Sequence, residues 1–258
     1  MAEGEREVFI EVRGLYQRFG ANHVLRGVDL DVYRGETVII LGRSGGGKSV
    51  LIKHMCGLVR PLEGRVVVEG EDITNLSERE LNAVRRKVSM MFQGGALFDS
   101  FTVGENIAFP LREAGLRDEK EIERRVEEAL EIVRMPGQKS KMPADLSGGM
   151  RKRVALARAV VEMPACVLYD EPHAGLDPVT ADSIDHLIKD LQEIHKVTSV
   201  VITHEIRSVS RLADRVVFMK DGRVYWVGSP AELSASEDPE LRNFIEGRSD
   251  NREGWEND

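Results

Sequence analysis

The sequence contains little cysteine, no excess of basic residues and no long apolar run. Cys56 and Cys166 are its only cysteines, neither belongs to a CxxC pair, and both have apolar neighbours. This pattern predicts two buried, reduced thiols and fits a reducing cytosol. The formal net charge of -8 argues against a nucleic-acid partner, because binding to a phosphate backbone usually needs a basic surface.

Signals for membrane insertion and secretion are also missing. No apolar stretch approaches the roughly 20 residues that a spanning helix needs. The N-terminus MAEGEREV is acidic and lacks the basic-then-apolar order of a signal peptide. A chain of 258 residues has enough material for one sizeable domain or two small ones. We therefore expect a soluble, cytoplasmic protein.

Strand and helix patterns alternate along the chain. Apolar residues at near-alternate positions predict strands at residues 8–15 and 24–32. Short, continuous apolar runs predict strands covered on both faces at residues 37–41, 166–170 and 198–203. Two segments of helical spacing follow one apolar stripe each, the first through Ile122, Val126, Leu130 and Val133, the second through Ile184, Leu187, Ile188, Leu191 and Ile194.

The order of these patterns predicts the fold class. Strands dominate both ends of the chain, and alternating runs around Asp221-Gly222 predict a hairpin near the C-terminus. Residues of about 94–160 are mostly helical. We therefore predict an α/β fold with an N-terminal antiparallel β part and an inserted helical subdomain. Residues 1–247 form the predicted domain, and residues 248–258 form a polar tail.

The segment GRSGGGKSV, residues 42–50, is rich in glycine and follows a predicted strand. Gly42, Gly47, Lys48 and Ser49 satisfy the pattern G-x-x-x-x-G-K-[ST], and a helix-like segment comes next. In that setting the backbone N–H groups of residues 44–49 can surround phosphates, because glycine has no side chain to obstruct them. Lys48 would reach the β- and γ-phosphates, and the Ser49 hydroxyl would bind Mg²⁺. The sequence predicts a nucleotide site here.

The predicted buried strand CVLYD ends in Asp170, and Glu171 follows directly after it. Asp170 is suited to hold Mg²⁺ through water or Ser49, and Glu171 to polarise the water that attacks the nucleotide. The alternative is that both acids merely end a strand.

A second anion site is indicated by LSGGMRKR, residues 146–153. Ser147 is typical of a helix N-cap, and Gly148 and Gly149 leave backbone N–H groups uncovered before the helix. A helix start softened by glycine is the plainer interpretation. As an anion site it poses a geometric problem, because one domain offers one triphosphate at one P-loop.

The order of the motifs GRSGGGKS, FQ, LSGGM, VLYDEP, AGLD and TH resembles the ATP-binding subunit of ABC transporters over nearly the whole chain. In that family two copies pack head to tail, and each LSGG motif caps the γ-phosphate held by the other copy. The resemblance thus resolves the geometric problem. It implies ATP and Mg²⁺ as cofactors and a second copy of the chain as a partner.

The resemblance also assigns roles to single residues. Phe19 would stack on adenine, with Tyr16 as the less favoured candidate. Gln93 would sense Mg²⁺ and the permease, His204 would contact the γ-phosphate, and Asp177 would lie at the dimer seam. Catalysis would thus involve Glu171, His204 and Gln93, and Mg²⁺ would be held by Ser49, Gln93 and Asp170. The partner copy's ATP would meet Ser147, Gly148, Gly149 and Asp177, and the chain's own ATP would meet Phe19, Val24, Gly42, Arg43, Ser44, Gly45, Gly46, Gly47, Lys48, Ser49 and Val50.

The chain departs from the usual family pattern at three positions. Met150 replaces a glutamine in LSGGQ, His173 replaces a common threonine after DEP, and Arg43 is uncommon in the loop. Neither Met150 nor His173 carries the charge chemistry of hydrolysis, so we expect hydrolysis to survive. Together with GRSGGGKSVLIKHMCGL, the segment after residue 90 resembles the Mla-type and Mce-associated phospholipid transport ATPases. This branch adds Mce-domain proteins and small accessory cytoplasmic subunits as expected partners, at the cytoplasmic face of the bacterial inner membrane.

The segment GGALFDSFTVGENIAFPL is rich in aromatic residues. In the family this region, near residues 94–110, receives the coupling helix of a permease, as in other helix-in-groove complexes. We expect most of its apolar side chains to belong to the core and one or two to serve as anchors.

Two further hypotheses stay open. The chain could be the ATPase of a small-solute importer, or it could itself be a soluble ABC ATPase acting on DNA or ribosomes. The absence of a heptad insertion, of a second ATPase domain and of a basic patch disfavours the soluble ATPase. In the tail, Trp255 is either part of a frayed end or an anchor on a neighbouring subunit.

Overall fold

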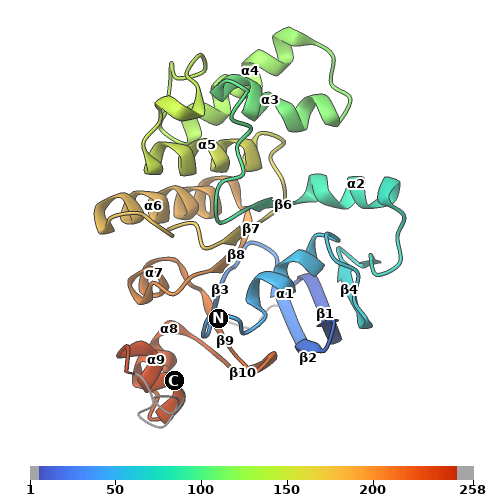
Figure 1. Cartoon of the computed structure of the whole chain (residues 1–258), viewed down its shortest axis with the longest axis vertical. Coiled ribbons are helices and arrows are strands. Elements are labelled where there is room, and N and C mark those ends of the chain that lie inside the picture. The colour runs from blue at the N-terminus through green and yellow to red at the C-terminus, as the bar shows by residue number, and fades with distance from the viewer. Residues whose placement is uncertain (1–5, 249–258) are drawn as a thin grey trace.

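The computed structural model describes residues 6–248 and contains two β-sheets (Figure 1). The larger sheet has six strands in the order β10-β9-β3-β8-β7-β6. Its strands pair in parallel except at the antiparallel β9–β10 edge. The strands are β3 (Thr37–Leu41), β6 (Val88–Met91), β7 (Cys166–Asp170), β8 (Thr198–Ile202), β9 (Arg215–Lys220) and β10 (Arg223–Gly228).

The smaller sheet is antiparallel and comes from the N-terminal part of the chain. Its order is β2-β1-β4-β5, so the first two strands form a long hairpin. The strands are β1 (Val8–Phe19), β2 (Asn22–Tyr33), β4 (Glu63–Val68) and β5 (Glu71–Asp72). Together the two sheets confirm the predicted α/β fold with an antiparallel N-terminal part.

The central strands are buried on both faces, as their continuous apolar sequences predict. Along β3, Val38 and Ile40 pack into one hydrophobic cluster, and Ile39 and Leu41 pack into the other. One cluster joins the sheet to the small sheet, α1 (Lys48–Met55) and α2 (Glu78–Lys87), and the other joins it to the remaining helices. The central sheet therefore separates two hydrophobic cores.

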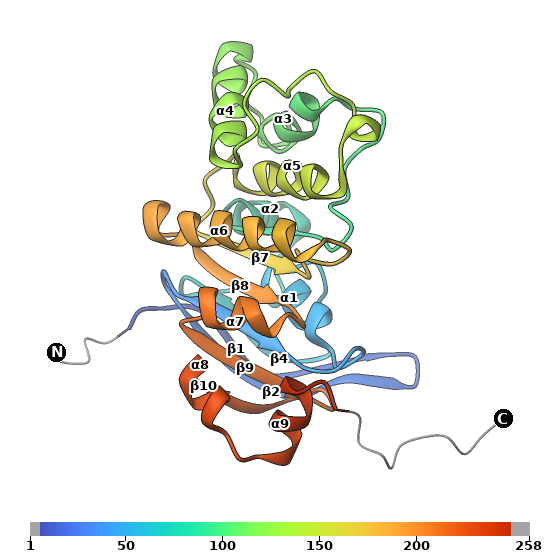
Figure 2. The same ribbon diagram turned by 90° about the vertical axis from the view of Figure 1, so that its left-hand side faces the viewer.

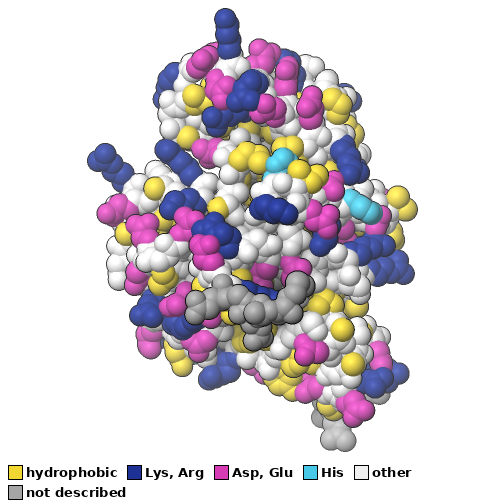
Figure 3. Space-filling view, turned by 180° about the vertical axis from the view of Figure 1, so that it is seen from behind, with side chains coloured by type: hydrophobic (Ala, Val, Ile, Leu, Met, Phe, Trp, Pro, Cys, Tyr) yellow, Lys and Arg dark blue, Asp and Glu magenta, His cyan; other side chains and the backbone are white. Residues whose placement is uncertain are grey.

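A helical subdomain is inserted between β6 and β7, which confirms that part of the fold prediction. It consists of α3 (Val103–Glu113), α4 (Glu119–Ile132), the short 3₁₀ helix η1 (Pro143–Asp145) and α5 (Gly148–Val160). Figures 1 and 2 both show it stacked on α6, with the sheets on the other side of that helix. Figure 3 shows acidic and basic side chains interspersed over the face seen from behind. The other helices are α2 (Glu78–Lys87), α6 (Pro178–His195), α7 (Ile206–Leu212), α8 (Pro230–Ala235) and α9 (Pro239–Ile245).

Most local predictions agree with the structure, with one correction. The hairpin turn lies at Asp221-Gly222, where both residues have positive φ. Every residue of the two predicted apolar stripes is buried except Ile194, which is 68% exposed. The prediction for Ile194 was wrong because the residue lies in the last turn of α6, two positions before Lys196, whose φ of 57° takes the chain out of the helix.

Other predictions concern the cysteines, the membrane and the tail. Both cysteines are free and buried, and burial raises the pKa of the Cys56 thiol to about 11. Within residues 6–248, no helix combines the length and apolar character that crossing a bilayer requires. Trp255 and nearly all of the predicted tail lie outside the described residues, so the hypotheses about them stay predictions.

Candidate nucleotide and catalytic site

The glycine-rich loop connects β3 to α1 and depends on two glycines for its shape. Gly42 has a φ of 143°, and a Cβ atom there would lie 2.3 Å from the carbonyl oxygen of Met219. Gly47 has a φ of 90°, and a Cβ atom there would lie 2.8 Å from the carbonyl oxygen of Val24. Any side chain at either position would therefore strain the backbone and displace a neighbouring strand.

The lysine of the loop lies inside the loop itself. The Lys48 ammonium donates hydrogen bonds to the carbonyl oxygens of Gly42 at 2.7 Å and Arg43 at 2.8 Å. Burial lowers its pKa, while the carboxylates of Glu171 and Asp170 oppose this shift. A largely buried ammonium beside exposed backbone N–H groups at the start of a helix forms a strong site for polyphosphate.

Ser49 and Asp170 link the loop to the end of β7. The Ser49 hydroxyl donates a 2.7 Å hydrogen bond to the Asp170 carboxylate, although the two residues are 121 positions apart. The pair offers only oxygen ligands, which are the ligands that Mg²⁺ prefers. Within the described residues, no group of three or more histidine, cysteine or acidic side chains could hold a metal. The site therefore fits an ion that also takes oxygens from a nucleotide.

Two predicted catalytic residues, Gln93 and His204, lie close to the third, Glu171. The Gln93 amide donates a 3.0 Å hydrogen bond to one carboxylate oxygen of Glu171. The Nδ1 atom of His204 lies 3.8 Å from the other oxygen. These residues come from the ends of β6, β7 and β8, which are adjacent parallel strands. The carboxyl edge of the sheet therefore carries the whole group, as expected for ligand sites in open α/β sheets.

The two aromatic candidates for adenine lie in different surroundings. Phe19 is 52% exposed at the end of β1. Tyr16 lies across its own sheet, so that a Cβ atom at Gly27 would come within 2.8 Å of its hydroxyl. Phe19 is thus the aromatic side chain more accessible to a ligand. Beside the loop is a pocket of about 510 Å³ that does not include Phe19 and is lined in part by the predicted contacts Val24, Arg43, Ser44, Gly45 and Gly46.

The LSGG motif lies at the start of α5, in the helical subdomain. The Ser147 hydroxyl caps the helix by accepting a 3.3 Å hydrogen bond from the Met150 N–H. Gly149 packs so closely on Thr180 of α6 that a Cβ atom would lie 2.4 Å from the Thr180 methyl group. Asp177 caps α6 directly beside this contact. The structure thus brings together the residues predicted to meet the partner copy, and Figures 1 and 2 show α6 between α5 and the sheet.

Two buried side chains near the site have contacts that the sequence analysis missed. The Lys152 ammonium donates hydrogen bonds to the backbone carbonyls of Gln93 and, at 3.5 Å, Glu171. The ring of His173 makes a buried contact with the Asp185 carboxylate, with Nε2 2.6 Å from Oδ1. The available signals were a basic run, RKR, and a departure from a family pattern, and neither indicates a buried partner.

A P-loop between β3 and α1, with two acidic residues at the end of β7 in the same sheet, defines the protein as a P-loop nucleotide hydrolase. The separate LSGG site narrows this class. Residues 25–174 match the family described as ABC transporter, and the chain belongs to that family. It is accordingly an ATP-binding subunit with ATPase activity.

Relatives in the family have several transport functions in their names. A probable ribonucleotide transport ATP-binding protein of Mycobacterium leprae is 39% identical over 93% of this chain and 70% of its own length. The intermembrane phospholipid transport system ATP-binding protein MlaF of Haemophilus influenzae is 38% identical over 93% of this chain and 91% of its own. The methionine import ATP-binding protein MetN of Rhizobium johnstonii is 40% identical over 93% of this chain and 66% of its own.

Solved structures agree with this assignment. The cassette MJ0796, described as a dimer bound to ADP and Pi after hydrolysis, has a TM-score of 0.79 and 32% identity, over 86% of this chain and 98% of its own. Clostridium perfringens cbiO1, part of the transporter complex cbiONQ, has a TM-score of 0.81 and 32% identity, over 94% of this chain and 96% of its own. The dimeric relative supports formation of a homodimer by this chain.

Proposed function

We propose that the chain forms a head-to-tail dimer that hydrolyses ATP and drives phospholipid transport through a membrane permease, at the cytoplasmic face of the bacterial inner membrane. The observation that carries the lipid assignment is the similarity to MlaF over 93% of this chain. The resemblance of the loop and of the segment after residue 90 to the same branch supports it. An importer of small solutes is the second candidate, because the methionine import relative is 40% identical over the same share of this chain, although the match covers 66% of that relative against 91% of MlaF.

Each catalytic residue has a role that its contacts support. Lys48 and the backbone of the loop bind the phosphates, and Ser49 and Asp170 provide ligands for Mg²⁺. When bound, the ion neutralises charge that develops on the phosphates. Glu171 acts as the base that orients and polarises the attacking water. Gln93 donates to one oxygen of its carboxylate and His204 lies near the other, which restricts where the carboxylate can point.

The partner copy completes the site in this proposal. Ser147, Gly148 and Gly149 present backbone N–H groups at the start of α5, and the helix dipole adds partial positive charge there. In a head-to-tail dimer these groups meet the γ-phosphate held by the other copy, with Asp177 at the seam. ATP binding thus closes the dimer, and hydrolysis with release of phosphate removes the anion that holds it closed.

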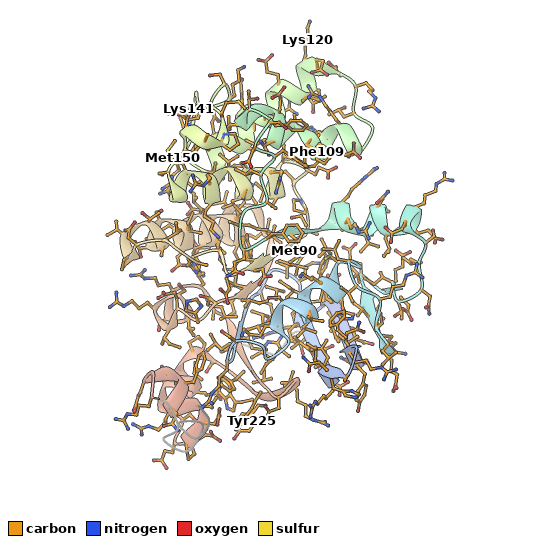
Figure 4. All side chains as sticks on the ribbon, in the orientation of Figure 1. Met90, Phe109, Lys120, Lys141, Met150 and Tyr225 are labelled. Atoms are coloured by element: carbon orange, nitrogen blue, oxygen red, sulfur yellow. The ribbon has the colours of Figure 1, made fainter. Side chains whose placement is uncertain are left out.

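A groove beside the helical subdomain is the proposed seat of the permease. Its volume is about 610 Å³, and Phe98, Phe109 and Pro110 line it together with Arg86 and Glu162. Figure 4 shows Phe109 in the helical subdomain above Met90 of β6, another residue that lines the groove. Phe98 is 41% exposed and packs against the ring of Phe109 with centroids 4.9 Å apart. This packing suits Phe98 to serve as an anchor for an amphipathic helix.

Hydrogen bonds also support the wall of the groove. Asn106 is fully buried, and its side-chain oxygen accepts a 2.8 Å hydrogen bond from the Phe98 N–H. Its NH₂ group lies within hydrogen-bond distance of the carbonyls of Phe98, Phe101 and Thr102. Val103 and Ile107 lie in the core below it. Most apolar side chains of the segment therefore support the groove, while Phe98 faces the surface.

The test is purification of the assembled transporter through a tag on this chain, followed by lipid mass spectrometry and ATPase assays. We expect a permease and phospholipid to copurify, and phospholipid rather than methionine to change ATP turnover. Phe98→Asp should release the permease without lowering the isolated chain's ATP binding. Copurification of a solute-binding protein, with turnover stimulated by methionine, would replace the lipid assignment by the second candidate.

A further inference from the structure

Lys152 is a buried cation to which the proposed mechanism gives no role. It lies on α5 and is 7% exposed. Its hydrogen-bond acceptors are two backbone carbonyls, those of Gln93 and Glu171. Burying an ammonium is costly unless its position is useful or its charge is compensated. Burial lowers its pKa, and the carboxylates of Glu171 and Asp170 partly offset that effect, so all three groups lie within electrostatic reach.

The contacts of Lys152 are part of a longer attachment between α5 and the segment after β6. Arg158, almost two turns further along the helix, donates to the carbonyls of Gly95 at 2.7 Å and Ala96 at 2.8 Å. Gly95 itself packs against α5, because a Cβ atom there would be 3.4 Å from the Ala155 methyl group. The segment 93–96 is therefore fixed to α5 at both of its ends.

This attachment reaches the catalytic carboxylate along two routes. The first runs through Gln93, whose backbone carbonyl binds Lys152 and whose amide donates to the Glu171 carboxylate at 3.0 Å. The second runs through the backbone of Glu171, whose carbonyl lies 3.5 Å from the Lys152 nitrogen. Glu171 has a φ of 47°, a conformation that a residue with a side chain keeps only when several contacts hold it.

We propose that Lys152 is a positioning residue for hydrolysis, which fixes Gln93 and Glu171 to the helix that begins with the LSGG motif. The inference rests on the proposed role of Glu171 as the base. In the head-to-tail dimer, the LSGG end of α5 meets the ATP of the other copy, and Glu171 faces the ATP of its own copy. Lys152 thus connects the two ATP sites of the dimer within one chain.

The variants separate charge, length and hydrogen bonding. Lys152→Met keeps the length of the side chain and removes the ammonium, whereas Lys152→Arg keeps a cation with several donors. We expect Lys152→Met to lower kcat about tenfold or more and to change the KM for ATP less than about twofold, because the residue does not touch the P-loop. Lys152→Arg should keep most of the turnover. Lys120→Met, on the outer end of the helical subdomain in Figure 4, is the matched control and should match the wild type.

A double-mutant cycle with Glu171→Gln distinguishes positioning from a purely structural role. If Lys152 acts through Glu171, then Lys152→Met lowers the single-turnover hydrolysis of the wild type but causes no further loss in Glu171→Gln. An equal loss in both backgrounds, or normal turnover in Lys152→Met, would overturn the inference. Near-normal turnover in Glu171→Gln alone would refute the proposed role of Glu171 and therefore also the inference. This outcome is distinguishable from the two outcomes that overturn only the role of Lys152. Should Lys152→Met fail to fold, Lys152→Gln keeps a donor without the charge and enters the same cycle with the same expectation of non-additivity.

Discussion

The buried pair of His173 and Asp185 offers a quantitative test of the structure. Both side chains are less than 5% exposed, and His173 Nε2 lies 2.6 Å from Asp185 Oδ1, although the contact is not aligned as a hydrogen bond. The other ring nitrogen lies 3.4 Å from the Thr203 hydroxyl. Asp185 also accepts a 2.8 Å hydrogen bond from Ser208 and lies 3.9 Å from Arg211. The pair therefore joins the segment after Glu171 to α6, α7 and the end of β8.

We predict that His173→Thr, which introduces the residue common in the family, destabilises this protein. Removal of one partner from a buried pair costs about 3–5 kcal/mol, because the remaining charge loses its compensation. Asp185 keeps Ser208 and the distant Arg211, so the cost should be about 3 kcal/mol, at the lower end of that range. In a domain of this size each kcal/mol lowers Tm by roughly 2–4 °C, which gives a fall of about 6–12 °C.

The measurement is thermal unfolding followed by circular dichroism in His173→Thr, with His186→Thr as the control. His186 lies on the same helix as Asp185, but its side chain is 61% exposed, so its replacement should leave Tm nearly unchanged. The double variant His173→Leu/Asp185→Leu should recover most of the loss, because apolar residues of similar volume can replace a buried ion pair. A Tm for His173→Thr within about 1 °C of the wild type would refute the reasoning.

Three further predictions concern chemistry, assembly and pH. Glu171→Gln should bind ATP but lose most hydrolysis, because it removes basicity and nearly keeps the shape, whereas Lys48→Ala should weaken nucleotide binding itself; ATPase and binding assays decide between these effects. ATP, but not ADP, should drive dimerisation of Glu171→Gln in light scattering, and a form that stays monomeric with ATP even when held on its permease would contradict the head-to-tail mechanism. Burial lowers the pKa of His54, so the unfolded chain gains a proton first as the pH falls. The free energy of unfolding should therefore fall as the pH drops below about 6.5, by up to about 1.4 kcal/mol per pH unit. Denaturant titrations of His54→Gln should lack this pH-dependent contribution.

The parts of the fold that sequence could predict have a local physical signature. The sequences TVIIL and CVLYD predict strands buried on both faces, because their positions are apolar except at one end of each strand. The structure buries every residue of both strands. The P-loop was predictable because its glycine spacing reflects backbone requirements within a few residues of sequence. Gln93 and His204 were assigned by family resemblance alone, because nothing in their neighbourhood indicates that both contact Glu171.

The features that could not be predicted depend on contacts with residues far away in the chain. Lys152 donates to the backbone carbonyl of Gln93, 59 positions away. Every residue has a backbone carbonyl, so no pattern of side chains in the sequence indicates this contact. Asp185 was placed on a helix correctly, but its charge gave no indication that it faces the core. Ile194 shows the converse case, because helical spacing predicts the direction of a side chain but not whether another element covers it there.

The backbone at Glu171 explains how two consecutive carboxylates serve different partners. In an extended strand, neighbouring side chains point to opposite faces, which alone would leave only one of them near the P-loop. At Glu171 the strand ends in a left-handed residue, whose N–H donates to the Ile202 carbonyl at 3.0 Å and whose carbonyl accepts from Ala174. The turn lets Asp170 bind Ser49 while Glu171 faces Gln93 and His204. A non-glycine residue in this conformation costs about 1–3 kcal/mol, and the surrounding contacts, including that of Lys152, hold it there. The conformation therefore separates the acid that we propose to bind Mg²⁺ from the acid that we propose to activate water.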